Sequence, residues 1–182
     1  MKRLLNITMM AVCCSLLLTA CSSEEESTEA ISLKFQLCAI DGNATKVFKN
    51  GDNVVFDLAI SNNSNSDITY GMEGADIIFG NDLYCVYSDD GRLIGVPWTG
   101  MYCEYIGKRY FFIPAKTVKH VYCTWNMSED FRSSHPLCKG EDKDKLPVGS
   151  YYTKFWVEYN DNVGGSKKRM VTKNFKVGFK VQ

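Results

Sequence analysis

The chain has 182 residues, with 21 basic and 21 acidic side chains and a formal net charge of zero. This balance leaves no large basic face, so a nucleic-acid partner is not expected. Aromatic residues make up 13% of the chain and charged residues 23%, a composition that suits a core-forming, β-rich domain.

The N-terminal segment has the pattern of a bacterial export signal. A positive start at Lys2 and Arg3 precedes the mainly apolar stretch 4–18. Leu18-Thr19-Ala20-Cys21 then resembles the lipobox of bacterial lipoproteins, which implies cleavage before Cys21 and lipidation of its thiol, with fatty acyl chains such as palmitate. The alternative is a transmembrane anchor, but the apolar stretch is interrupted by polar residues and is short for a spanning helix. We therefore expect residues 1–20 to be a lipoprotein signal peptide.

Residues 21–30 follow as an acidic segment with four glutamates and three serines. They have nothing to bury, so we expect a disordered tether between the lipid on Cys21 and a folded domain. Acids so close to a lipidated cysteine look like the tract that some Gram-negative bacteria use to export lipoproteins to the cell surface. An ordinary polar linker explains the same residues. The expected location is the cell envelope, as an outer-membrane lipoprotein on either face of the membrane.

The remaining residues, 31–182, carry the signals of strands separated by turns. Apolar and polar residues alternate with period two in several of these segments. The predicted strands are 31–40, 54–60, 68–70, 82–87, 92–98, 110–113, 118–125, 150–159 and 169–181. Asp90-Gly91 predicts a hairpin turn, because glycine tolerates the positive φ of a type I′ turn. With no persuasive long helix, the sequence predicts one all-β domain, an antiparallel immunoglobulin-like β-sandwich of about seven to nine strands.

Five cysteines remain in the expected mature chain besides the lipidated one: Cys38, Cys85, Cys103, Cys123 and Cys138. Disulfides persist outside the cytoplasm, and an odd count leaves at least one thiol unpaired or paired between molecules. We predict the pairs Cys85–Cys103, closing a hairpin region, and Cys123–Cys138, closing the polar segment after a strand. Cys38 is then a small buried hydrophobe. Other connectivities stay open, because sequence alone does not give them.

Residue types that support catalysis are sparse. The two histidines are His120, in a strand pattern that predicts a structural role, and His135. His135 with Cys123 and Cys138 offers three zinc-binding side chains, but no Cys-x-x-Cys pair accompanies them and a disulfide explains the same cysteines. A Gly-x-Ser-x-Gly elbow, a cysteine-protease signature and a Gly-rich phosphate-binding motif are all missing. We expect neither an enzyme nor a bound metal or cofactor.

The aromatic residues Trp98, Tyr102 and Tyr105 form the candidate binding surface. Rigid aromatic side chains offer a large contact area at little entropic cost, so they suit stacking on a sugar or anchoring a protein. The alternative is that they plug one end of the sandwich and serve the core.

A series of features between about Val54 and Tyr159 has a familiar order. An apolar strand runs into Ser61-Asn62-Asn63, and it is followed by Ile68-Thr69-Tyr70, Leu83-Tyr84-Cys85-Val86-Tyr87, Asp89-Asp90-Gly91, Trp98, the corner Ile113-Pro114-Ala115-Lys116, Tyr122-Cys123-Thr124-Trp125 and Pro147-Val148-Gly149-Ser150-Tyr151. This order resembles the intracellular proteinase inhibitor family of immunoglobulin-like β-sandwiches. The corner departs from the family's Pro-Gly-Glu, and no reactive-site loop carries over.

The resemblance implies a non-catalytic, protein-binding domain, with a protease as its expected partner. In this chain the domain belongs to a membrane-anchored lipoprotein, where it would protect the cell from secreted proteases. The alternative is a cell-surface interaction or glycan-handling accessory lipoprotein, which the aromatic residues near Trp98 and the acidic tract favour.

Overall fold

The computed structural model describes residues 29–71, 73–101, 110–126, 134, 136–138 and 143–182. The predicted signal peptide, Cys21 and most of the tether lie outside the described residues. All regular secondary structure that is described is β. The strands are β1 (Ile31–Cys38), β2 (Val47–Phe48), β3 (Val55–Asn62), β4 (Ile68–Gly71), β5 (Ile77–Phe79), β6 (Val86–Ser88), β7 (Leu93–Gly95), β8 (Tyr110–Ile113), β9 (Val118–Thr124), β10 (Gly149–Asn160) and β11 (Met170–Val181).

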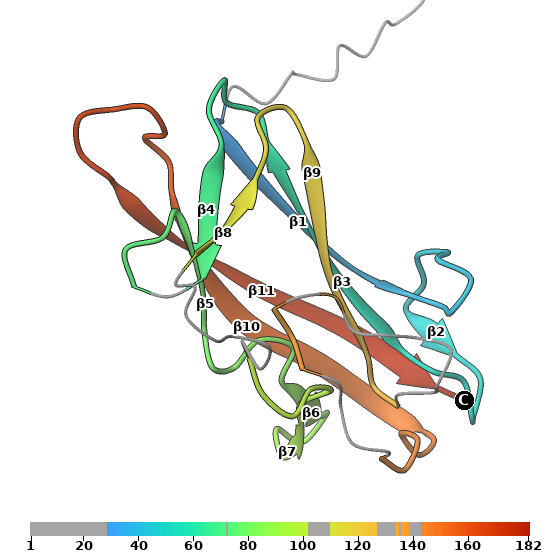
Figure 1. The fold of residues 1–182 in the computed structure, drawn as a ribbon. Coiled ribbons are helices and arrows are strands. Elements are labelled where there is room, and N and C mark those ends of the chain that lie inside the picture. Colours follow the sequence, from blue (N-terminus) through green and yellow to red (C-terminus); the bar gives the residue numbers. More distant parts are fainter. Residues whose placement is uncertain (1–28, 72, 102–109, 127–133, 135, 139–142) are drawn as a thin grey trace, which may run out of the picture.

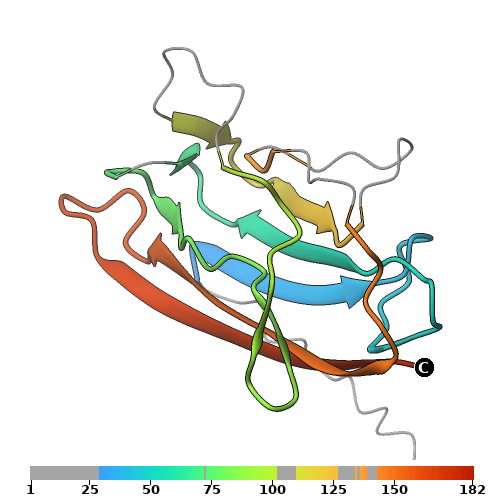
Figure 2. The same ribbon diagram turned by 90° about the horizontal axis from the view of Figure 1, so that it is seen from below.

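The strands form two sheets that pack face to face (Figure 1). The small sheet has the order β1-β3-β9, and the large sheet has the order β2-β11-β10-β5-β4-β8, with β6 also paired to β10. Figure 2 shows the two layers from below. The order β1-β3-β9 facing β11-β10-β5 is that of strands A-B-E facing G-F-C in an immunoglobulin sandwich. The predicted all-β sandwich is therefore confirmed.

The details differ from the prediction in three places. The strands described number eleven rather than seven to nine, because β2 and β5 have only two and three residues and are too short to show an alternation. The pairs β2–β11 and β4–β5 are parallel, whereas the rest are antiparallel. The strand predicted at 82–87 begins only at Val86, because turn hydrogen bonds from Leu83 N to Gly80 O and from Cys85 N to Asp82 O precede it.

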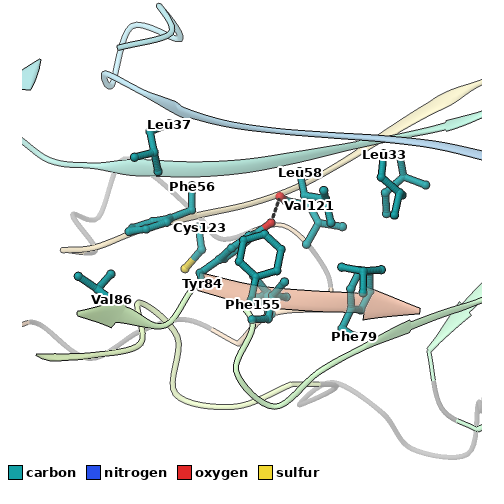
Figure 3. Packing of buried hydrophobic residues seen from close by; sticks show 14 of the residues in the cluster. Leu33, Leu37, Phe56, Leu58, Phe79, Tyr84, Val86, Val121, Cys123 and Phe155 are labelled. Carbon is teal, nitrogen blue, oxygen red and sulfur yellow. Dashed lines mark hydrogen bonds between the residues drawn. The ribbon is translucent and has the colours of Figure 1, made fainter. Parts of the chain in front are cut away.

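The core lies between the sheets, where alternate residues of the long strands face inward (Figure 3). The small sheet contributes Phe56 and Leu58 from β3, and the large sheet contributes Phe155 and Val157 from β10, all at most 1% exposed. Tyr84 enters this layer from the turn before β6. In β3 and β10, the residues next to these inward-facing side chains point outward, because side chains alternate between the two faces along a strand.

A tyrosine corner fixes the start of β10. The hydroxyl of Tyr151 donates a hydrogen bond to Pro147 O, four residues upstream, over 2.8 Å. This contact is a hallmark of immunoglobulin-like sandwiches, in which a tyrosine near the start of strand F bonds back to the preceding turn. This hydrogen bond holds the segment Pro147-Val148-Gly149-Ser150-Tyr151 in the turn that leads into β10.

The chain enters the sandwich at one end. Asn63, in the β3–β4 loop, holds this entry, because its N–H donates to Ala30 O over 2.8 Å and its Nδ2 to Glu29 O over 3.0 Å. The β6–β7 hairpin and the C-terminus lie toward the opposite end (Figure 1). Anything tethered through the segment before Glu29 would therefore present that hairpin away from its anchor.

Asp76 links β4, β10 and the β10–β11 loop. We expect these contacts to make the stability of the fold sensitive to acid. Its carboxylate accepts hydrogen bonds from Thr69 N and Oγ1, both at 2.8 Å, from Asn160 Nδ2 at 3.1 Å, and contacts Lys168 Nζ at 2.9 Å. Burial disfavours its charge, but these donors outweigh burial and hold its pKa below the ordinary value. The ionised group thus stabilises the folded state above the unfolded pKa, and this stabilisation is lost as pH falls through the folded pKa.

We expect Asp76→Asn to lower the free energy of unfolding at neutral pH by roughly 1–3 kcal/mol, because charge-assisted hydrogen bonds are lost. Urea unfolding at neutral pH and below about pH 4 checks this, since the variant should lose less stability in acid than the unmodified chain. Asp144→Asn is the control, because the Asp144 side chain is exposed and its carboxylate makes no hydrogen bond or ion pair within the part of the chain that the structure describes. Equal acid sensitivity of both variants and the unmodified chain would contradict the assignment.

Candidate functional site

The predicted aromatic surface is only partly described. Trp98 is half-buried and packs against the core, and its Nε1 donates a hydrogen bond to Leu83 O over 2.7 Å. Tyr102 and Tyr105 lie outside the described residues. The structure therefore places Trp98 in the packing beneath a hairpin, and a shared aromatic surface with Tyr102 and Tyr105 stays a prediction.

That hairpin, β6–β7, projects from the large sheet. β6 pairs with β10, whereas β7 pairs with β6 alone among the described strands. The turn is closed by hydrogen bonds from Ser88 N to Arg92 O at 3.0 Å and from Gly91 N to Ser88 O at 2.9 Å. Gly91 has a φ of 86°, which confirms a hairpin turn at Asp90-Gly91, but Asp90 does not share the positive φ that the predicted type I′ turn requires.

Asp90 braces the turn from within. Its Oδ1 accepts hydrogen bonds from Ser88 Oγ and from Arg92 N, and these donors hold the pKa of Asp90 below its ordinary value. The carboxylate is therefore ionised at neutral pH and its side chain is fixed. Asp89, Arg92 and Leu93 stay exposed around it, Leu93 to 56%. The tip is a braced, convex loop with charged and apolar side chains on its surface.

Two anchors tie the base of the hairpin to the core. On its N-terminal side, Tyr84 is fully buried and its hydroxyl donates to Val121 O over 2.6 Å (Figure 3). On its C-terminal side, Trp98 bonds to Leu83 O, and Pro97 O accepts a hydrogen bond from the Cys123 thiol at 3.3 Å. Because both ends are tied to the core, the hairpin is a rigid projection rather than a free loop.

A pocket of about 470 Å³ lies between the hairpin and the start of β10. Its lining combines acids, one arginine and the tyrosine corner: Ser88, Asp89, Asp90, Arg92, Ile94, Pro147, Gly149, Ser150 and Tyr151. This concavity lies toward the end of the sandwich opposite the chain entry, so hairpin and pocket form one contact region.

A second pocket, of about 360 Å³, opens on the outer face of the small sheet. It contains Cys38, Asp57 and His120, and Nδ1 of His120 lies 2.9 and 3.0 Å from the two carboxylate oxygens of Asp57. His120 lies in β9, half exposed, as a strand histidine. Burial raises the pKa of the Cys38 thiol, and Asp57 raises it further. A protonated thiol is a poor nucleophile, so this grouping does not support nucleophilic catalysis.

Both predicted disulfides are wrong, because Cys85 and Cys123 are free, buried thiols. Cys123 points into the core between the sheets, where burial raises its pKa to about 12, whereas Cys138 lies beside Gly100 and donates its N–H to Gly100 O. Cys138 is disulfide-bonded, and its partner lies outside the described residues, as does Cys103. Cys38 is free and buried, which confirms its prediction as a small buried side chain.

No protein-family model, curated protein or solved structure matches the chain. Among the described residues, no three histidine, cysteine or acidic side chains are grouped so that they could hold a metal ion. That same part of the chain contains no helix with the length and apolar character to cross a membrane. His135, one of the three zinc-binding side chains considered above, lies outside the described residues.

Sequence reasoning located the hairpin turn but missed its significance. The signal is present in Asp89-Asp90-Gly91, yet nothing in the sequence says that, of the strands the structure describes, β7 pairs only with β6. The Asp57–His120 pair was also missed, because the two residues are 63 positions apart and meet only through the register of β3 with β9.

Proposed function

We propose that this chain is a lipid-anchored, non-catalytic binding protein of the bacterial cell envelope that inhibits a protease through its β6–β7 hairpin. The lipobox-like segment ending at Cys21 and the acidic residues after it support the anchor. The entry of the chain beside Asn63, at the end opposite the hairpin, supports the orientation, because the hairpin would face away from the membrane.

The single observation that carries the proposal is the braced hairpin tip. A protease cleft accepts a convex loop, and a loop already fixed in its bound shape loses little entropy on binding. Ser88 and Asp90 fix the turn from inside, while Arg92 and Leu93 remain exposed for contact. Arginine is one of the residue types that carry most of the binding energy in protein interfaces, and the exposed leucine beside it adds apolar contact area.

The resemblance to the intracellular proteinase inhibitor family supports the same partner class. The glycan-handling alternative loses part of its original basis, because Trp98 is tied to Leu83 at the base of the hairpin. It stays a second candidate through a different surface, the outer face of β10 and β11.

We expect the chain from Ser22 onward, which includes every described residue, to inhibit at least one enzyme in a panel of serine and cysteine proteases. Arg92→Ala and Leu93→Ala should each weaken that inhibition by about tenfold or more, as truncation of an interface anchor does. Inhibition constants from substrate turnover, with melting temperatures of each variant, give the measurement.

Lys167→Ala is the matched control, since Lys167 is an exposed cation in the β10–β11 loop. Absence of inhibition across the panel at micromolar protein contradicts the proposal. So does rapid cleavage after Arg92 without inhibition, which would make the hairpin a substrate.

A further inference from the structure

The outer face of the large sheet is built from alternate residues of β10 and β11. Tyr151, Thr153, Phe155 and Val157 face the core, so Tyr152, Lys154 and Trp156 point outward. Across the strand pair these three residues lie opposite Gly178, Lys176 and Asn174. The result is a face with aromatic rings at both ends and two cations between them.

The two cations are in direct register. Lys154 and Lys176 are cross-strand partners, and like charges at such positions destabilise a sheet. No ion pair within the described residues involves either lysine. Asp82 and Lys154 interact electrostatically, and burial raises the pKa of this carboxyl group. A charge arrangement that costs stability is expected where a surface serves a ligand.

The aromatic groups on either side are held in fixed positions. Tyr152 stacks on Tyr87 of β6, with ring centroids 5.1 Å apart and an interplanar angle of 12°. Lys176 Nζ lies 4.5 Å from the centre of the Tyr152 ring. Trp156 packs against Gly80, where an added Cβ would come within 2.6 Å of the ring, so only glycine fits beneath it. Both Tyr152 and Trp156 remain partly exposed.

We propose that this face binds an acidic polysaccharide, with uronate or sulfate groups between Lys154 and Lys176 and a sugar ring against Trp156, while Tyr152 holds Lys176 in place. The face of an aromatic ring is electron-rich, so it attracts the weakly positive C–H groups of a pyranose. The paired ammonium groups complement an anionic substituent, and their mutual repulsion is relieved when it binds. This ligand and this surface differ from the protease and the hairpin proposed above.

A single-stranded nucleic acid also stacks on aromatic residues and needs cations. The export signal favours the polysaccharide, because a chain in the cell envelope meets acidic glycans at its surface.

The test is binding of the chain from Ser22 onward to polygalacturonate and chondroitin sulfate, with dextran and an oligothymidylate as comparison probes. We expect binding to the acidic glycans that weakens as ionic strength rises. The double variant Lys154→Gln/Lys176→Gln should lose about tenfold in affinity or more, and Trp156→Ala a similar amount. Melting temperatures show whether each variant remains folded, and Trp156→Phe keeps the test informative if the alanine variant does not fold.

The matched control is Lys34→Gln/Lys167→Gln, which removes the same charge from exposed positions away from this face. Failure to bind either acidic glycan overturns the proposal, as does tighter binding of dextran or the oligothymidylate. An equal loss of affinity in the control variant also overturns it, because binding would then follow net charge. Inhibition of a protease, or its absence, leaves this outcome unchanged.

Discussion

Replacing Tyr84 with alanine is expected to lower the free energy of unfolding by about 3–5 kcal/mol, the usual cost of deleting a buried aromatic ring. The ring is fully buried and stacks on Phe35 and Phe56 with centroids 5.6 Å away in each case, while Phe155 meets it edge-on at 5.1 Å. Its removal leaves a cavity between the sheets and frees the N-terminal side of the β6–β7 hairpin. Chemical denaturation of the chain from Ser22 onward measures the loss.

Tyr84→Phe separates the packing of the ring from its hydrogen bond. This variant keeps the ring and loses only the bond to Val121 O, for which we expect roughly 0.5–1.5 kcal/mol. Equal losses of stability in the alanine and phenylalanine variants would contradict a stabilising role for the contacts of the Tyr84 ring.

Trp98→Ala carries the second large effect, a loss of about 3 kcal/mol in the free energy of unfolding, at the lower end for aromatic truncation because the side chain is half-buried. The variant removes the hydrogen bond to Leu83 O and the packing beneath the hairpin. Protease inhibition should decline because the hairpin loses its C-terminal anchor. Melting temperature and inhibition constant should therefore change together.

The opposite result would restore Trp98 to a binding surface. An unchanged melting temperature with lost binding means that the ring contacts a ligand, whereas a lowered melting temperature returns it to the core. Lys167→Ala is the control, since Lys167 is an exposed residue of the β10–β11 loop. It should leave the melting temperature close to that of the unmodified chain.

Alternation predicted the long strands well, because one side of each faces the core and the other faces outward. β10 and β11 run over 12 residues each and carry the clearest pattern. The strand predicted over residues 82–85 is wrong for a physical reason. Its apolar residues suggested a strand, but Leu83 and Tyr84 are buried from a turn in which Tyr84 takes a φ of 61°. Burial and extension are separate properties, and composition reports only the first.

Contacts that depend on tertiary geometry were beyond sequence reasoning. A disulfide needs two Cβ atoms within a few ångströms, and spacing along the chain does not determine that distance. The predicted disulfide Cys123–Cys138 rests on the polar segment that joins the two residues, whereas the thiol of Cys123 faces the core. The juxtaposition of Lys154 with Lys176 likewise depends on the register of β10 with β11, which places residues 22 positions apart side by side.

The three free thiols occupy different layers of the sandwich. Cys38 lines the pocket outside the small sheet, Cys123 lies between the sheets, and Cys85 precedes β6 on the side of the large sheet. In the oxidising compartment that the proposed export implies, we expect each thiol to stay reduced while the closed sandwich keeps it buried. Once heat opens it, these thiols meet one another and the Cys138 disulfide, and exchange locks the chain out of its native pairing. The working lifetime of the protein is then governed by its rate of unfolding rather than by its equilibrium stability.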